Sequence, residues 1–110
     1  MFCECHELKE IKGINKFNTS KVTNMNGMFK SCKSLINLEL NFDTSNVMDM
    51  GLIFCECHEL KEIKGINEFN TSKVTNMIAM FGFCRSLFEF PDISKWDTKN
   101  VLSISFLFSD

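Results

Sequence analysis

The sequence has no tyrosine, a single proline, a single tryptophan and a net charge of only −2 over 110 residues. Acidic and basic residues are interspersed, which excludes the basic patch that nucleic-acid-binding proteins carry. No stretch reaches the roughly 18 consecutive apolar residues of a membrane-spanning helix, so we expect no membrane insertion in this segment. Signatures of phosphate-binding loops, dinucleotide sites and hydrolases are also missing from the sequence. We therefore expect a protein that is not an enzyme and uses no cofactor.

What the sequence contains is a repeat. Residues 2–25 and 54–77 are identical except that Lys16 of the first copy is Glu68 in the second. A weaker period lies within this duplication, because five phenylalanines recur at intervals of 27, 25, 27 and 27 residues. Other apolar columns follow them at fixed offsets: Cys5, Cys32, Cys57 and Cys84; Leu8, Leu35, Leu60 and Leu87; Ile11, Leu38, Ile63 and Phe90; Phe17, Phe42, Phe69 and Trp96; Val22, Val47, Val74 and Val101; Met25, Met50, Met77 and Ile104.

A unit of this length cannot bury its own apolar face, but neighbouring units can bury it for each other. We therefore predict a single solenoid over residues 1–110, part of a longer array, with about four stacked coils near residues 2–28, 29–53, 54–80 and 81–107. These are called the first to fourth repeats below. The second repeat is shorter, since it lacks two residues between Leu38 and Phe42.

Each coil is predicted to contain a short strand, a turn and a short helix or 3₁₀ segment. Residues 35–40 read Leu-Ile-Asn-Leu-Glu-Leu, whose alternation favours a strand. In the first and third repeats the strand runs into Gly13 or Gly65, a bulge or bend. The next segments begin Asn-Thr-Ser or Asp-Thr, which favours turns or helix N-caps. The apolar spacing of Val22, Met25, Met28 and Phe29 then favours a short helical segment.

The recurring string Phe-Asp/Asn-Thr-Ser-Asn/Lys-Val-x-x-Met-x-x-Met-Phe-x-x-Cys-x-Ser-Leu resembles the BspA-like leucine-rich-repeat surface proteins. The resemblance covers essentially the whole chain. It implies an α/β leucine-rich-repeat-like solenoid with an exposed sheet, carried on a secreted or cell-surface protein. It also implies adhesion, with a protein ligand such as a host surface or matrix protein. It supplies no catalytic residues.

The predicted binding face is a row of strand-flanking side chains. One offset, next to the cysteine column, holds basic residues, and a second offset lies three residues later. Such a stripe could meet an acidic partner, although neighbouring glutamates could equally balance it as an ordinary solvated surface. The residues are His6, Lys9, Lys33, Ile36, His58, Lys61, Arg85 and Phe88.

Two roles are considered for the cysteines, one structural and one in metal binding. Those in the repeated column favour a structural role, because free cysteine packs as a small buried hydrophobe. The string Cys-x-Cys-His, present twice, could supply zinc ligands. However, the copies are two repeats apart, roughly 10 Å at sheet spacing, so we predict no metal site. Three functions remain: a protein-binding module, a structural spacer whose ligand site lies elsewhere, and a metal or redox protein built on Cys3, Cys5, Cys55 and Cys57.

Overall fold

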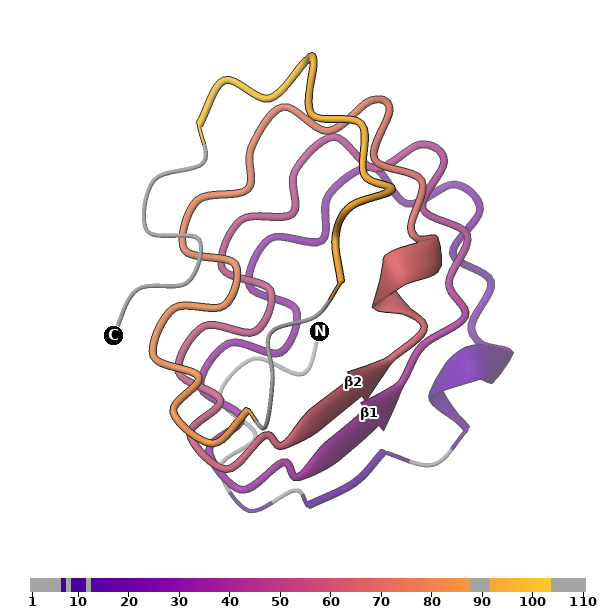
Figure 1. Cartoon of the computed structure of the whole chain (residues 1–110). Coiled ribbons are helices and arrows are strands. Elements are labelled where there is room, and N and C mark those ends of the chain that lie inside the picture. The colour runs from indigo at the N-terminus through magenta and orange to yellow at the C-terminus, as the bar shows by residue number, and fades with distance from the viewer. Residues whose placement is uncertain (1–6, 8, 12, 88–91, 104–110) are drawn as a thin grey trace.

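The computed structural model describes residues 7, 9–11, 13–87 and 92–103, and its regular elements are short (Figure 1). They are the 3₁₀ helix η1 (Ile14–Lys16), strand β1 (Asn37–Glu39), strand β2 (Glu62–Lys64) and the 3₁₀ helix η2 (Ile66–Glu68). The two strands pair in parallel, with Leu38 opposite Ile63. The strand predicted over residues 35–40 is therefore confirmed for its central part. Gly65, where a bend was predicted, has a φ of 90° and begins η2.

The predicted α/β leucine-rich-repeat-like solenoid of about four stacked coils is wrong. Among the described residues, strands occur only in the second and third repeats and 3₁₀ helices only in the first and third. The described part of the chain contains no α-helix. The molecule is a compact body of 34 × 31 × 21 Å. The repeats differ because each extended segment is too short to propagate a sheet, and the predicted helical segments adopt another conformation.

These predicted helical segments are series of tight turns. Between residues 25 and 32, Met28, Lys30 and Cys32 each donate their N–H to the carbonyl three residues earlier. The alternate N–H groups point the other way and donate, at 2.8–3.0 Å, to the equivalent segment farther along the chain. An α-helix would keep these groups for its own ladder. The bonds run from Met25 to Asp49, from Gly27 to Gly51, from Phe29 to Ile53 and from Ser31 to Cys55.

Two positions in each turn segment require a left-handed backbone. Gly27 fills the first position in one segment, with a φ of 67°, but Leu52 and Ala79 fill it in the next two with φ of 59° and 49°. The second position is held by Ser31, Glu56 and Phe83 with φ of 59–63°. A left-handed conformation costs an L-residue about 1–2 kcal/mol. The turn segments therefore contain strain that only the bonds to their neighbours offset.

Replacing Glu56 with glycine is expected to stabilise the chain by about 0.5–1 kcal/mol, because glycine adopts a positive φ without strain. The measurement is urea unfolding of the variant beside the parent. Glu59→Gly is the matched control, since Glu59 is exposed and is not among the positive-φ residues. There glycine should destabilise. A Glu56→Gly variant that is no more stable than the parent would contradict the strain described above.

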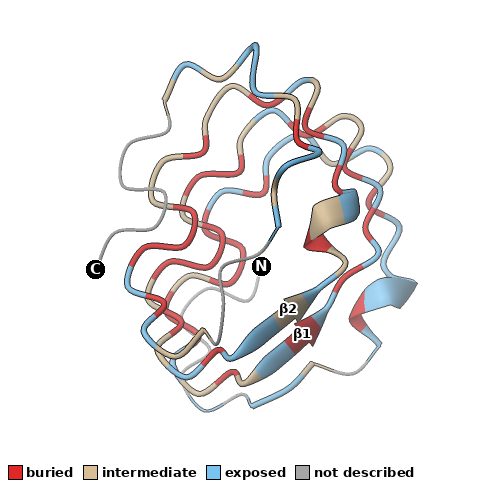
Figure 2. Ribbon diagram, in the orientation of Figure 1, coloured by how far each residue is buried: buried red, intermediate tan, exposed pale blue. Residues whose placement is uncertain are grey.

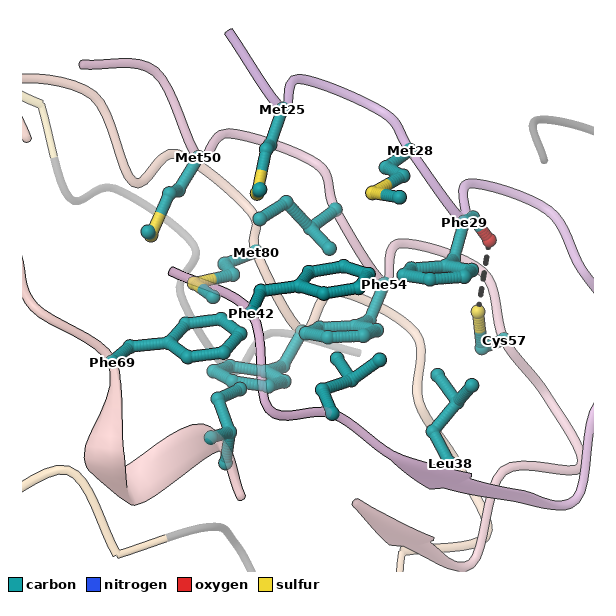
Figure 3. Packing of buried hydrophobic residues seen from close by; sticks show 14 of the residues in the cluster. Met25, Met28, Phe29, Leu38, Phe42, Met50, Phe54, Cys57, Phe69 and Met80 are labelled. Atoms are coloured by element: carbon teal, nitrogen blue, oxygen red, sulfur yellow. Dashed lines mark hydrogen bonds between the residues drawn. The ribbon is translucent and has the colours of Figure 1, made fainter. Parts of the chain in front are cut away.

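The core is built on the predicted columns. Phe29 stacks on Phe54, as Figure 3 shows, with ring centroids 5.6 Å apart. Phe54 stacks in turn on Phe81, with ring centroids 5.5 Å apart. Most described members of the valine, methionine, leucine and cysteine columns are buried in the same cluster as these rings, and Figure 2 marks the buried positions along successive segments. Burial of the columns is thus confirmed for most of their described members. Phe17 is an exception at 46% exposed, whereas Phe42, Phe69 and Trp96 in the same column are buried.

Buried threonines join one repeat to the next. The Thr44 hydroxyl donates to the carbonyl of Asn70 at 3.1 Å and accepts the N–H of Asn70 at 2.8 Å. Thr19 does the same with Asp43, and Thr71 with Asp97. One hydroxyl thus serves both backbone groups of a residue in the following repeat. This explains why threonine follows Asn or Asp in the repeated string.

The Asn or Asp before the threonine of each repeat forms the predicted turn. Asn18, Asp43, Asn70 and Asp97 each accept, through Oδ1, the backbone N–H two residues later, at 3.0–3.1 Å. The Ser45 hydroxyl also donates to Asp43. Hydrogen bonds from the Ser45 hydroxyl and N–H lower the pKa of Asp43 below its usual value. The turn prediction is therefore confirmed.

Candidate functional site

The shorter second repeat leaves a hollow surface between two helical turns. In the first repeat Gly13, with a φ of 75°, leads into η1, and in the third repeat Gly65 leads into η2. The second repeat lacks two residues at this point and runs straight from Leu40 to Phe42 without a helical turn. In Figure 1, η1 lies beyond β1, on the side away from β2.

Two adjoining hollows result. The first, called the outer groove, has a volume of about 630 Å³ and lies across the sheet next to η1. The second, called the inter-helix hollow, measures about 300 Å³. The outer groove is lined by Glu10, Ile11, Gly13, Ile14, Asn15, Lys16, Asn37, Leu38, Glu39, Glu62 and Lys64. The inter-helix hollow is lined by Asn15, Glu39, Leu40, Asn41, Phe42, Gly65 and Glu68.

Asn15 stands where the two hollows meet. Its side-chain Nδ2 donates to the carbonyl of Glu39 at 2.9 Å, and its Oδ1 accepts the N–H of Asn41 at 2.9 Å. The chain of the first repeat turns away at Gly13, so its backbone cannot pair with these two groups. The Asn15 amide pairs with them instead and fixes η1 to the second repeat. The wall of the outer groove is therefore held in place by defined hydrogen bonds.

Charged side chains of both signs lie above an apolar floor. Ile14, Leu38, Leu40 and Phe42 are buried beneath the two hollows. On the rim of the outer groove, Nζ of Lys64 lies 3.7 Å from Oε1 of Glu62. At Glu68, which lines the inter-helix hollow, Oε1 lies 3.5 Å from Nζ of Lys95. Exposed pairs such as these contribute at most about 1 kcal/mol to stability. They can exchange partners at little cost, so the rim can present either charge to a ligand.

The structure places the predicted face beside the outer groove. Lys9, Ile36 and Lys61 lie in one row, because the N–H of Ile36 donates to the carbonyl of Lys9 and the N–H of Lys61 donates to the carbonyl of Ile36. Lys33 and Arg85 are exposed and His58 is half-buried. His6 and Phe88 lie outside the described residues. None of the predicted residues that the structure describes lines the two hollows.

The hollows were missed by the sequence analysis, although a signal for them was present. The two-residue deletion between Leu38 and Phe42 marks the repeat without a helical turn. The glycines at 13 and 65 mark the two repeats that have one. A binding face was sought among basic residues shared by all repeats, whereas the concave surface arises where the repeats differ.

The cysteine column is part of the core. Cys57 is fully buried, and its Sγ donates to the carbonyl of Phe29 at 3.1 Å, as the dashed line in Figure 3 shows. The Sγ of Cys84 bonds the carbonyl of Phe54 in the same way at 3.0 Å. Of the cysteines proposed as metal ligands, Cys3 and Cys5 lie outside the described residues. Within the described ranges, no three His, Cys, Asp or Glu side chains are grouped to hold a metal.

Raising the pH should destabilise the chain through Cys57. Burial, followed by the neighbouring thiols Cys84 and Cys32, raises the pKa of Cys57 well above its usual value. Below about pH 8.5 the thiol is protonated in both the folded and the unfolded chain. Above that pH only the unfolded chain releases the proton, so stability falls by about 1.4 kcal/mol per pH unit for this thiol.

The measurement is the free energy of unfolding as a function of pH between neutral and alkaline solution. Cys57→Ser is the control, because a serine hydroxyl does not titrate there and can still donate to Phe29. Its stability should decline less steeply with pH than that of the parent. Identical slopes for the two chains would show that Cys57 does not remain protonated in the folded state.

The described part of the chain is a repeat protein with a structural cysteine column and a concave outer surface. None of its described helices has the length and apolar character needed to cross a bilayer. The chain belongs to the family described as "Mycoplasma protein of unknown function, DUF285", whose model matches residues 36–110. No curated protein and no solved structure matches the chain.

Proposed function

We propose that this chain is a non-catalytic protein-binding module and that its ligand occupies the outer groove. The observation that carries the proposal is a groove of about 630 Å³ whose wall, η1, is fixed by the two hydrogen bonds of Asn15. Ligands bind most often to concave surfaces with positioned polar groups, and this groove is lined mainly by polar and charged side chains. Glu39 borders both hollows, so a ligand that spans them would contact it.

We further propose that the module is displayed on a cell surface or secreted and acts in adhesion, as the resemblance to BspA-like leucine-rich-repeat surface proteins implies. The proposed partner is a host surface or matrix protein. A mixed-charge rim favours a polypeptide ligand, because extended chains carry charged side chains of both signs beside apolar ones. Protease treatment of intact source cells, followed by a search for released repeat peptides, tests the location. Release only after lysis would contradict it.

The binding site is tested with the labelled chain on a panel of purified extracellular-matrix proteins and on fixed mammalian cells. For any partner found, Glu39→Arg should weaken binding at least about tenfold, equivalent to 1.4 kcal/mol. Lys99→Glu is the surface control, since Lys99 is exposed in the fourth repeat and lines neither hollow.

Lys61→Glu separates the outer groove from the neighbouring row of Lys9, Ile36 and Lys61. If Lys61→Glu abolishes binding while Glu39→Arg does not, the row is the site and the groove is not. Failure to bind any member of the panel or the cells would favour the structural spacer over a binding module.

A further inference from the structure

The inter-helix hollow carries charge of one sign, whereas the outer groove carries both. Among the described residues, the charged side chains that line the hollow are Glu39 and Glu68, and no lysine or arginine lines it. Leu40 and Phe42 are buried and form its apolar floor. In Figure 1 the second repeat passes between η1 of the first repeat and η2 of the third. The hollow is therefore bounded by repeats that the chain itself supplies.

The carboxylate of Glu39 has no partner in the described part of the chain. Glu39 is exposed, and no described side chain donates a hydrogen bond to its carboxylate or forms an ion pair with it. Lys64 stands opposite Glu39 in the parallel sheet, but its ammonium lies 3.7 Å from Glu62. The Glu39 carboxylate is thus available to a cation from outside the chain.

The carboxylate of Glu68 is partly available. Its Oε1 accepts Nδ2 of Asn67 at 3.2 Å and the ammonium of Lys95 at 3.5 Å. Its Oε2 accepts no hydrogen bond from the described residues. Both side chains of the pair with Lys95 are 69% exposed, and an exposed pair of this kind is weak. A cation in the hollow can therefore bind Glu68 in addition to Lys95 or in place of it.

The single difference between the duplicated segments makes this hollow acidic. Lys16 in the first copy is Glu68 in the second. Lys16 is the last residue of η1 and lines the outer groove, whereas Glu68 is the last residue of η2 and lines the inter-helix hollow. A lysine at position 68 would give the hollow one charge of each sign. The same 3₁₀ helix accepts either residue at its end, so this position can be changed without disturbing the fold.

We propose that the inter-helix hollow binds a lysine or arginine side chain of a polypeptide whose main chain lies in the outer groove. This inference rests on the function proposed above and names the side chain that the site selects. The aliphatic stem would pack on Leu40 and Phe42, and the charged end would lie between Glu39 and Glu68, as long basic side chains divide between apolar and polar surroundings. A volume of about 300 Å³ is at the lower limit for ligand pockets, which suits a single side chain.

The test is an NMR titration of the nitrogen-15-labelled chain with synthetic peptides capped at both ends. A short host of glycine, serine and alanine carries arginine, lysine, citrulline or glutamate at its centre. The arginine and lysine peptides should shift the side-chain amide signal of Asn41, which lines the hollow, and the N–H signal of Glu68. Citrulline has nearly the shape of arginine without its charge, so its peptide should bind about tenfold more weakly. The glutamate peptide should not bind.

Two results of the titration would overturn the inference. Equal affinity for the arginine and citrulline peptides would show that the site does not recognise the charge, while binding in the outer groove would stand. Absence of any shift with arginine and lysine peptides up to millimolar concentrations would show that the hollow does not accept a basic side chain.

Glu68→Lys should weaken binding of the arginine peptide about tenfold or more, because it replaces an attraction with a repulsion. Glu59→Lys is the matched control, since Glu59 is exposed, lines neither hollow and gives the same change in net charge. Circular dichroism establishes that both variants fold. Lys95→Ala should strengthen binding about twofold, because it removes a competing cation. Equal losses in the two lysine variants would reveal general charge attraction and overturn the site.

A partner found on the panel of matrix proteins or on cells separates this inference from the proposed function. Glu39→Arg and Glu68→Lys should both weaken binding of that partner, because Glu39 borders both hollows and Glu68 lines only the inter-helix hollow. If Glu39→Arg weakens binding and Glu68→Lys does not, the partner occupies the outer groove without a side chain in the inter-helix hollow. That result would overturn this inference alone.

Discussion

Replacing Gly65 with alanine is expected to cost about 3–5 kcal/mol of folding free energy, an exceptionally large effect for one methyl group. A Cβ at this position would overlap the carbonyl oxygen of Leu40. That carbonyl belongs to the backbone of the neighbouring repeat, and the Leu40 N–H is itself bonded to the carbonyl of Lys64. The clash cannot be relieved by rotating a side chain. Relief requires the third repeat to move away from the second. Urea unfolding of both chains measures the loss.

Gly13→Ala is the matched control. Gly13 occupies the same position in the duplicated segment and has a φ of 75°, but an added Cβ would meet nothing closer than the flexible side chain of Lys16, at 3.9 Å. Alanine there should cost only the left-handed strain of about 1–2 kcal/mol. The difference between the two variants isolates the contact with Leu40. Equal losses would show that the repeats do not pack this closely at Gly65.

Replacing Thr44 with valine is expected to destabilise the chain by about 1–3 kcal/mol. Valine has nearly the same shape, so packing of the buried Thr44 side chain is preserved. The N–H and carbonyl of Asn70 would lose the hydroxyl that serves both, and each lost hydrogen bond costs about 0.5–1.5 kcal/mol. The free energy from denaturant unfolding is again the measured quantity.

The control is Thr98→Val. Thr98 has the same place in its repeat but is exposed. Its substitution should therefore change the stability by less than about 0.5 kcal/mol. Thr44→Ser, which keeps the hydroxyl, should retain more of the stability than Thr44→Val. If Thr44→Val were as mild as Thr98→Val, the hydroxyl would not be a major link between repeats.

The sequence predicted the core well because the columns record which side chains face inward. The stacked rings of Phe29, Phe54 and Phe81 follow directly from their spacing. It predicted the local conformation poorly in the turn segments. Apolar residues three or four apart mark one side of a helix, but consecutive three-residue turns produce the same spacing. The two conformations differ in the left-handed backbone at two positions of each turn segment, and residue types such as Leu52 and Glu56 do not signal it.

The predicted binding face and the outer groove are different surfaces. Lys9, Ile36 and Lys61 lie in one row, and the groove, which the sequence analysis did not predict, lies beside that row. Its position depends on a length difference between repeats and on the reach of one amide, Asn15, across to Glu39 and Asn41. Columns describe what repeats share, so they cannot locate a surface that exists because one repeat is shorter.

The hydrogen bonds of the turn segments also affect the rate at which an asparagine of the chain deamidates. Asn26 is followed by Gly27, a pair in which the glycine nitrogen can attack the side-chain amide and release ammonia. Glycine is prone to this reaction because it has no side chain to obstruct the ring that forms. Here the Gly27 N–H is bound to the carbonyl of Gly51 at 3.0 Å, and Asn26 Nδ2 is bound to Asp49 at 3.1 Å. Contact between neighbouring segments therefore protects this pair from deamidation for as long as the chain stays folded.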